Sequence, residues 1–244
     1  MTNNILAVVT ARGGSSLSGK NYRLINGKPL FIWSLIAALK VDYINYIAVS
    51  SNCPKVEEIF YDFAANDKLF QDNYNRLIFI NRPEEISGPQ SKNEEALIHA
   101  VDFMEEYFNF VPDSIVNLQP TSPVRNNDLL SNCIEEYYGL GYDSLVTVNR
   151  VTPLMWQKTE DGLKCYFDIY NRPMRQSILP EKWFWHDAGN VYLTNKNILM
   201  STGCRVGNNP CLYEISDYQA LQIDSEFHFD IVEQMSTKYG QFVQ

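Results

Sequence analysis

Short, continuous apolar runs separated by polar turns recur along the first 150 residues. A strand that is buried on both faces shows this pattern, which lacks strict alternation and is rich in Val and Ile. We therefore expect strands at 5–10, 46–51, 77–81, 114–119 and 143–149.

Amphipathic stretches lie between these runs and predict helices. They cover residues 29–40, which open on a proline suited to a first helical turn, 54–65, 93–107 and 127–138. Alternation of strand and helix predicts right-handed βαβ units. We expect an α/β fold with a doubly wound, mostly parallel sheet.

The pattern changes after residue 151. Pro153, Pro173 and Pro180 interrupt a region rich in Trp and Tyr, in which residues 160–162 are suited to a hairpin turn. Residues 224–239 return to helical spacing. Because no linker or repeat is present, we expect one domain over 1–244, with an inserted lobe at about 151–190 that is a dimerisation element.

Composition narrows the class of protein. Of 244 residues, 45% are hydrophobic, which excludes a disordered chain, and the net charge of −9 argues against nucleic acid or an anionic membrane as partner. Five basic and no acidic residues occur in the first 40 positions, so this segment has the opposite sign. No apolar run reaches the roughly 18 residues of a membrane span.

Cysteine usage and the N-terminal residues favour the cytoplasm. The five cysteines are scattered without a CxxC pair, which indicates reduced thiols rather than a disulfide scaffold or zinc site. The first residues contain no basic stretch before an apolar one, so we expect no signal peptide.

A glycine-rich loop, ARGGSSLSGKN at 11–21, directly follows the first expected strand. Consecutive small residues can direct backbone N–H groups to an anion, and Arg12 and Lys20 add positive charge, which together suit a polyphosphate. Residues 14–20 also match a P-loop up to Asn21, which stands where that motif has Ser or Thr. A P-loop phosphotransferase and a plain surface loop are the alternatives.

Further motifs follow the loop in order. They are NGKPL at 26–30, RPEE at 82–85, LQPTSPVR at 118–125, RQ at 175–176 followed by LP, and IDSE at 223–226. With the glycine-rich loop, this series resembles the acylneuraminate cytidylyltransferases, the CMP-sialic acid synthetase family, over essentially the whole chain. HDAG at 186–189 is more similar to the branch that activates pseudaminic or legionaminic acid.

The resemblance implies a fold like that of nucleotide-diphospho-sugar transferases and an enzyme that couples CTP to a nonulosonic acid, a nine-carbon α-keto sugar acid. It also implies Mg²⁺ as cofactor and a homodimer in which the lobe reaches the partner's active site. The catalytic residues it implies are Arg12, Lys20 and Asp224, with Asp224 as the metal ligand. The nucleotide-binding residues are Ala11, Arg12, Gly13, Gly14, Ser15, Lys20, Asn21 and Arg82. The sugar-binding residues are Gln119, Ser122, Arg175, Gln176, His186, Asp187 and Tyr192.

Several positions depart from the family pattern. Ser16 and Asn52 replace a basic and an acidic residue, and Gln222 replaces the first of two acidic residues, which leaves Asp224 alone. Other open readings are a same-fold enzyme for another sugar or nucleotide, and a non-catalytic nucleotide-binding homologue. Asp224 could instead cap the last helix, and His186 could act as a base.

Overall fold

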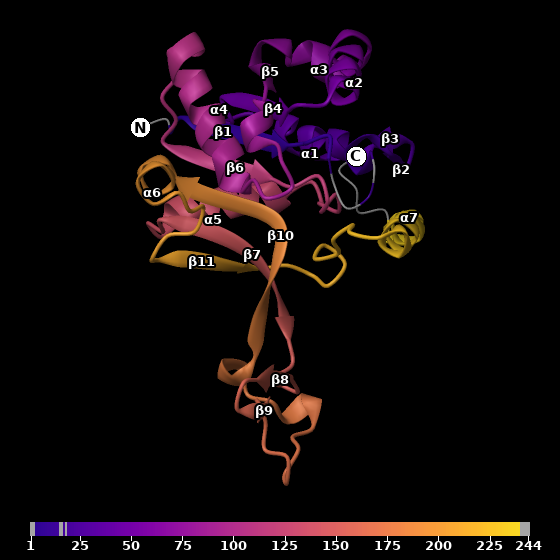
Figure 1. Ribbon diagram of the computed structural model, residues 1–244, viewed down its shortest axis with the longest axis vertical. Coiled ribbons are helices and arrows are strands. Elements are labelled where there is room, and N and C mark those ends of the chain that lie inside the picture. Colours follow the sequence, from indigo (N-terminus) through magenta and orange to yellow (C-terminus); the bar gives the residue numbers. More distant parts are fainter. Residues whose placement is uncertain (1–2, 15–16, 18, 240–244) are drawn as a thin grey trace.

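The computed structural model describes residues 3–14, 17 and 19–239 and is built around a seven-stranded sheet of order β11-β7-β10-β6-β1-β4-β5 (Figure 1). Its strands are β1 (Ile5–Thr10), β4 (Tyr46–Ser51), β5 (Leu77–Asn81), β6 (Ser114–Leu118), β7 (Ser144–Val151), β10 (Phe184–Asn195) and β11 (Pro210–Glu214). Only β10 runs antiparallel to its neighbours, β6 and β7. The expected mostly parallel α/β sheet is therefore confirmed.

Helices cover both faces of the sheet (Figure 1). Buried side chains of α1 (Leu30–Leu39), α2 (Pro54–Asn66), α5 (Leu129–Gly139) and α7 (Glu226–Tyr239) belong to the larger core on one face. Those of α4 (Asn93–Phe108) and α6 (Lys196–Thr202) belong to a second core on the other face. A short α3 (Lys68–Asp72) extends α2. Because neighbouring residues of β1 enter opposite cores, the sheet is doubly wound.

The five expected strands and five expected helices are present within two residues of their predicted bounds, but several elements were not predicted. They include β10, α6, β11 and the short α3. The first four residues of β10, Phe184–Asp187, are exposed or half-buried and mix aromatic with polar side chains, and the register against β7 shifts between Asp187 and Tyr192, so no continuous apolar run marks this strand. Alternation of strand and helix predicts only parallel strands, so it does not predict a strand that lies antiparallel between β6 and β7.

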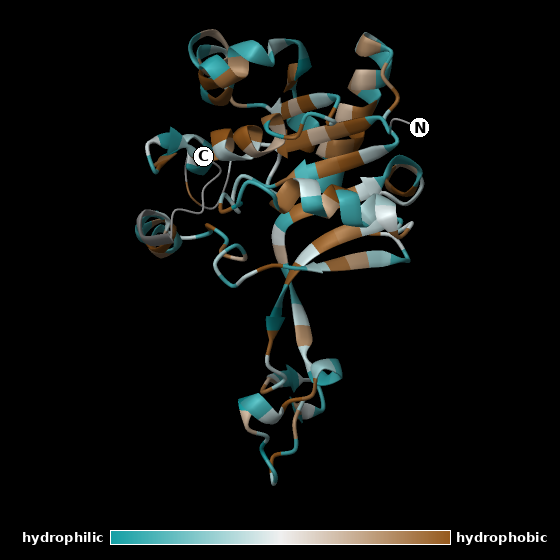
Figure 2. Ribbon diagram, turned by 180° about the vertical axis from the view of Figure 1, so that it is seen from behind, coloured by the Kyte–Doolittle hydropathy of each residue, from teal (hydrophilic) through white to brown (hydrophobic). Residues whose placement is uncertain are grey.

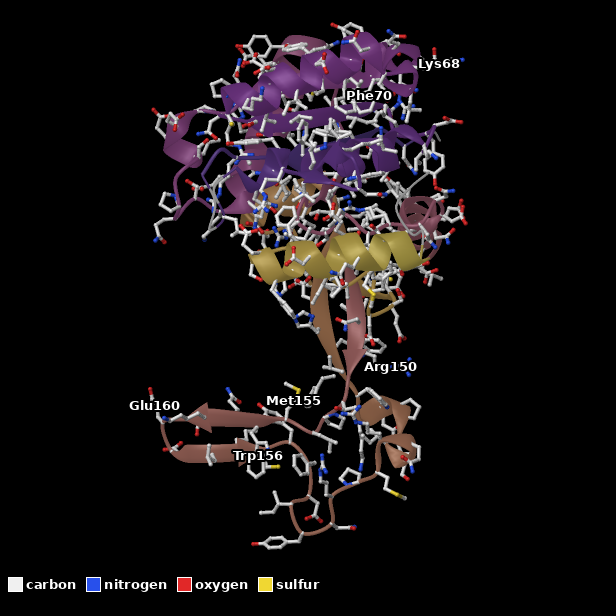
Figure 3. All side chains as sticks on the ribbon, turned by 90° about the vertical axis from the view of Figure 1, so that its right-hand side faces the viewer. Lys68, Phe70, Arg150, Met155, Trp156 and Glu160 are labelled. Carbon is white, nitrogen blue, oxygen red and sulfur yellow. The ribbon has the colours of Figure 1, made fainter. Side chains whose placement is uncertain are left out.

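A lobe leaves the sheet at the end of β7 and returns at the start of β10 (Figure 1, Figure 2). It contains a hairpin of β8 (Trp156–Thr159) and β9 (Gly162–Cys165), with the expected turn between them, and the single turns η4 (Arg175–Ser177) and η5 (Pro180–Lys182). Figure 3 shows Met155, Trp156 and Glu160 well away from the helices that cover the sheet. Neither β8 nor β9 contains a buried residue.

Two simple features complete the fold. Each of the five cysteines is a free thiol, in keeping with the prediction of a reduced protein. Within the described part of the chain, no helix is both long enough and apolar enough to cross a membrane.

Candidate active site

A polar cleft of about 350 Å³ lies at the carboxyl edge of the parallel strands, where α/β sheets bind ligands. Residues from six separate segments line it: Thr10, Arg12, Lys20, Asn21, Arg82, Ser91, Lys92, Asn93, Gln119, Pro120, Thr121 and Asp224. The fold thus brings together six of the residues singled out by sequence, namely Arg12, Lys20, Asn21, Arg82, Gln119 and Asp224.

The glycine-rich loop is held by its neighbours. Arg12 donates through Nη1 to the Gly88 carbonyl at 2.7 Å, and Asn21 Nδ2 donates to the Arg12 carbonyl at 2.8 Å. Gly13 donates its backbone N–H to Asn52 Oδ1 at 3.0 Å, so this amide is engaged within the protein. Ala11 is fully buried behind the loop, Gly14 is exposed, and Ser15 and Ser16 lie outside the described residues.

Asn52 and Glu84 support the glycine-rich loop without lining the cleft, a role that the sequence analysis did not assign to them. Asn52 accepts from Gly13 while its Nδ2 lies 3.2 Å from both carboxylate oxygens of Glu84. An amide can accept and donate at once, whereas an ionised carboxylate can only accept. The Asn at position 52 therefore links the loop to the segment after β5, and its departure from the family pattern was the signal.

The loop does not have P-loop geometry. It leads into η1 (Lys20–Tyr22), a single turn, and then into the hairpin of β2 (Leu24–Ile25) and β3 (Lys28–Pro29). The next α-helix begins only at Leu30, whereas a P-loop presents a helix N-terminus to the phosphates. The P-loop alternative is therefore wrong.

Lys20 and Arg82 are buried cations at the cleft. Lys20 Nζ donates to the Ile223 carbonyl at 3.0 Å and to Asp224 Oδ1 at 3.2 Å. Arg82 donates through Nε to Ser50 Oγ at 3.0 Å and through Nη2 to the Ser50 carbonyl at 2.5 Å. Burial, together with the charge of Arg12, lowers the pKa of Arg82 to about 10. An anion bound beside Arg82 and Arg12 would relieve this penalty, so the cleft suits a polyphosphate.

The segment after β6 is supported from behind by Arg125, which the motif contained but which we had not assigned a role. Arg125 is fully buried and donates to Ser34 Oγ at 3.1 Å, to the Gln119 carbonyl at 3.1 Å and to the Asn190 carbonyl at 2.8 Å. Ser122 is also fully buried and does not line the cleft, so its predicted contact with substrate is not seen. Gln119, in contrast, reaches the cleft.

Asp187 and Tyr192 shape β10 rather than line the cleft, contrary to their predicted contact with the sugar. Asp187 Oδ1 accepts from the Tyr192 hydroxyl at 2.7 Å and from the Gly189 N–H at 2.9 Å. Tyr192 is 3% exposed, Arg205 stacks 4.2 Å from its ring centroid, and burial raises the pKa of its hydroxyl. These contacts stabilise the irregular turn at Gly189, which has a φ of 61°.

The remaining predicted sugar ligands lie outside the cleft of this chain. His186 is exposed on the neck of the lobe, with Nδ1 3.1 Å from Asn149 Oδ1, and does not reach the cleft as a base. Arg175 and Gln176 are exposed in η4 of the lobe, where Gln176 contacts Met174 Sδ at 3.5 Å. A single chain therefore does not bring the lobe residues to the cleft.

Asp224 lies at the cleft and is not the cap of the last helix. α7 begins at Glu226, and Ser225 Oγ accepts from the His228 N–H at 3.3 Å, so Ser225 is the capping residue. The Asp224 carboxylate is 58% exposed and paired with Lys20. Among residues 3–14, 17 and 19–239 there is no cluster of three or more His, Cys, Asp or Glu that could hold a metal ion. One carboxylate still fits Mg²⁺, which commonly takes one or two carboxylates together with substrate phosphates.

Comparison with known proteins defines the class. Residues 6–169 match the family described as cytidylyltransferase, and the chain belongs to this family. Along the sequence it is 25% identical over 237 residues to the N-acylneuraminate cytidylyltransferase of Escherichia coli O18:K1:H7, covering 95% of this chain and 52% of the relative. The chain thus spans about half the length of that relative.

A second relative is of similar length. The CMP-N,N'-diacetyllegionaminic acid synthase of Legionella pneumophila is 25% identical over 211 residues, which cover 86% of this chain and 82% of that protein. Among solved structures, CMP-2-keto-3-deoxy-manno-octonic acid synthetase in complex with CTP superposes with a TM-score of 0.65. It is 16% identical and covers 97% of this chain and 99% of its own, which supports the nucleotidyltransferase-like fold.

Proposed function

We propose that this protein transfers the cytidylyl group of CTP to a nonulosonic acid, which gives a CMP-sugar and pyrophosphate. The observation that carries the proposal is the cleft in which Arg12, Lys20 and Arg82 lie together at the carboxyl edge of the sheet. Three cations around one polar cleft suit a triphosphate. The family and the named relatives support cytidine as the nucleotide and a sialic-acid-like sugar as the acceptor.

The reaction forms one bond and breaks one. The anomeric hydroxyl oxygen attacks the α-phosphorus of CTP and its proton passes to water, while the bond from the α-phosphorus to the pyrophosphate oxygen breaks and pyrophosphate leaves as an anion. Little covalent work is needed from the protein, so positioning and neutralisation of charge account for most of the catalysis. Arg12, Lys20 and Arg82 supply the charge, and Gln119 holds the acceptor beside the phosphates.

We propose Mg²⁺ as the cofactor, held by Asp224 and the phosphates of the substrate. Bound there, the ion supplies further positive charge to the triphosphate. Asp224→Asn should raise the half-saturating Mg²⁺ concentration about tenfold, in pyrophosphate release and in calorimetric binding of CTP, since one charge-assisted contact is lost. The free energy of unfolding should stay unchanged, because Ser225 caps α7. A loss of stability with unchanged dependence on Mg²⁺ would contradict this role.

We further propose that two chains associate through the lobe and that Arg175 reaches the cleft of the partner, where its guanidinium binds the sugar carboxylate. The lobe has no core of its own, and a cavity of about 760 Å³ opens between Tyr166, Trp183 and Phe184. The exposed apolar side chains of the lobe include Met155, Trp156, Leu163, Ile169, Tyr170, Met174 and Leu179. Such exposed aromatic and aliphatic side chains are typical of an interface.

Pyrophosphate release from CTP and Mg²⁺ tests the activity, with N-acetylneuraminic, N,N'-diacetyllegionaminic and pseudaminic acids as acceptors. We expect release with at least one of these acids and none without an acceptor. CTP binding without release for any acid would instead favour a non-catalytic nucleotide-binding homologue. Release with ATP or GTP in place of CTP would favour a same-fold enzyme of other specificity. The free thiols of all five cysteines support action in the cytoplasm.

A further inference from the structure

Gln222 stands where the family pattern has an acidic residue, and its side chain lies beside that of Gln119. The backbone of this segment runs along the segment after β6, since the Ile223 N–H donates to the Thr121 carbonyl at 2.8 Å. A Cβ atom on Gly189 would lie 2.7 Å from Gln222 Nε2 and 3.0 Å from Gln119 Oε1. The two carboxamides therefore lie on the same side of Gly189.

The backbone beneath the two carboxamides is fixed. Gly189 has a φ of 61°, and its N–H is bound by Asp187, which also accepts from buried Tyr192. A side chain at position 189 would collide with both glutamines, so the glycine allows their close approach. The irregular turn of β10 thus packs directly against the Gln119 and Gln222 side chains.

Both carboxamides are free to bind a ligand. Within the described residues, neither the Gln119 nor the Gln222 side chain has a hydrogen-bond partner, although both residues are half-buried. Each offers two donors and one acceptor oxygen. Partly buried polar groups without partners favour a polar ligand, because a bound hydroxyl or amide would restore the hydrogen bonds lost with water.

The pair differs in charge from the other polar groups of the cleft. Arg12, Lys20 and Arg82 line the cleft as cations, whereas Gln119, which also lines it, and Gln222 beside Gln119 are neutral. Neutral carboxamides select hydroxyl and acylamido groups, and they contribute no charge to a metal ion.

We infer that Gln222 is a specificity-determining residue that binds a hydroxyl or acylamido substituent of the sugar acid together with Gln119, and that it is not a metal ligand. The inference rests on the proposed function for the identity of the acceptor. It explains the loss of an acidic residue at this position as a change of role, because a carboxamide both donates and accepts hydrogen bonds, whereas an ionised carboxylate only accepts them.

Steady-state kinetics of Gln222→Leu tests the inference, because leucine has a similar volume without hydrogen bonds. With the best acceptor of the three sugar acids, we expect its KM to rise about tenfold, the size expected for one or two lost hydrogen bonds. The KM for CTP and the half-saturating Mg²⁺ concentration should not change. Gln234→Leu, at an exposed position of α7, is the matched control and should leave all three values unchanged.

Gln222→Asp separates the sugar from the metal. We expect a higher KM for the sugar acid and an unchanged Mg²⁺ requirement. A sugar KM within twofold of wild type for Gln222→Leu would overturn the inference. A lower Mg²⁺ requirement for Gln222→Asp at unchanged sugar KM would also overturn it and assign the position to the metal.

Calorimetry distinguishes failure of this inference from failure of the proposed function. Each sugar acid is titrated into protein that is saturated with CDP in EDTA, where no pyrophosphate can be released. Binding to wild type that Gln222→Leu weakens would support the inference even if no acid is turned over. Wild-type protein that binds none of the three acids, or a variant that binds them equally well, would overturn it.

Discussion

The cleft and the lobe differ in how far the charged side chains are buried and hydrogen-bonded within the chain. At the cleft, Lys20, Arg82 and Arg125 are buried and donate to named oxygens of the protein. In the lobe, Arg172 and Arg175 are exposed, and β8 and β9 bury nothing. A buried cation is stable only with partners that replace water, so the cations of the cleft are held by the chain itself, whereas those of the lobe remain in solvent.

The largest expected difference between cleft and lobe is in the loss of stability when an arginine is replaced. Arg125→Met should lower the free energy of unfolding by about 3 kcal/mol, because three carbonyl and hydroxyl oxygens lose their donor inside the core. Chemical denaturation measures the change. Arg172→Met in the lobe is the matched control and should change stability by less than about 0.5 kcal/mol. Equal losses in the two variants would break the contrast between cleft and lobe.

The second largest expected effect is on the affinity for CTP. Lys20→Ala should raise the Kd for CTP about 30-fold, which corresponds to the loss of a charge-assisted contact in a buried site. Lys40→Ala removes an exposed charge from the same basic segment and should leave the Kd unchanged. The measurement is calorimetric binding of CTP. If the two variants bind CTP alike, Lys20 serves only to hold Asp224.

Mixed dimers test whether the lobe completes a partner's cleft. Lys20→Ala and Arg175→Ala should each be inactive alone, since each lacks one half of every site. Mixed in equal amounts after dissociation, they should recover about a quarter of wild-type activity, because half of the dimers then contain one intact site. No recovery, with dimers present by analytical ultracentrifugation, would place Arg175 with the cleft of its own chain or outside the reaction.

The smallest effect concerns His99 on α4. Burial and the charge of Arg82 lower the pKa of His99. Phosphates bound at Arg82 would neutralise that charge, so addition of CTP should raise the His99 pKa, and CTP should bind more tightly as the pH falls through this titration. NMR of the His side chains measures the shift, with exposed His186 as the internal reference. An unchanged His99 pKa would place the phosphates away from Arg82.

The pattern of apolar residues was sufficient to predict the parallel strands of the sheet. β1, β4 and β6 are buried on both faces, which produces runs of apolar residues that can be recognised without knowledge of the neighbouring strands, and the half-buried edge strand β5 has a similar run. β10 lacks such a run, because its first half belongs to the exposed neck of the lobe and its middle is turned by Gly189. Its position between β6 and β7 follows from pairing, which a local pattern does not contain.

Motifs identified which segments meet at the cleft, but not what each side chain does there. Arg12, Lys20 and Arg82, which the resemblance assigns to nucleotide binding, line the cleft. Tyr192 and Ser122, which the same resemblance assigns to sugar binding, are buried in the interior. Whether a polar group is free for a ligand depends on the hydrogen bonds that the folded neighbours provide, and these neighbours come from distant parts of the chain.

The distribution of charge shows most clearly what the sequence determines and what the tertiary structure determines. The sequence by itself determined that the first 40 residues are basic and the rest acidic, and that strand, loop and helix follow in order. Only the tertiary structure decided which of the basic residues pair with carboxylates. Lys20 pairs with Asp224 and Arg23 with Glu226, across more than 200 residues, whereas Arg12 and Arg82 face the cleft without a carboxylate partner among the described residues. Ion pairs form between groups that are close in space. Glu226 begins α7 and Asp224 lies just before it, and α7 packs against the segment that follows the glycine-rich loop, since Arg23 lies 4.2 Å from the ring centroid of Phe229.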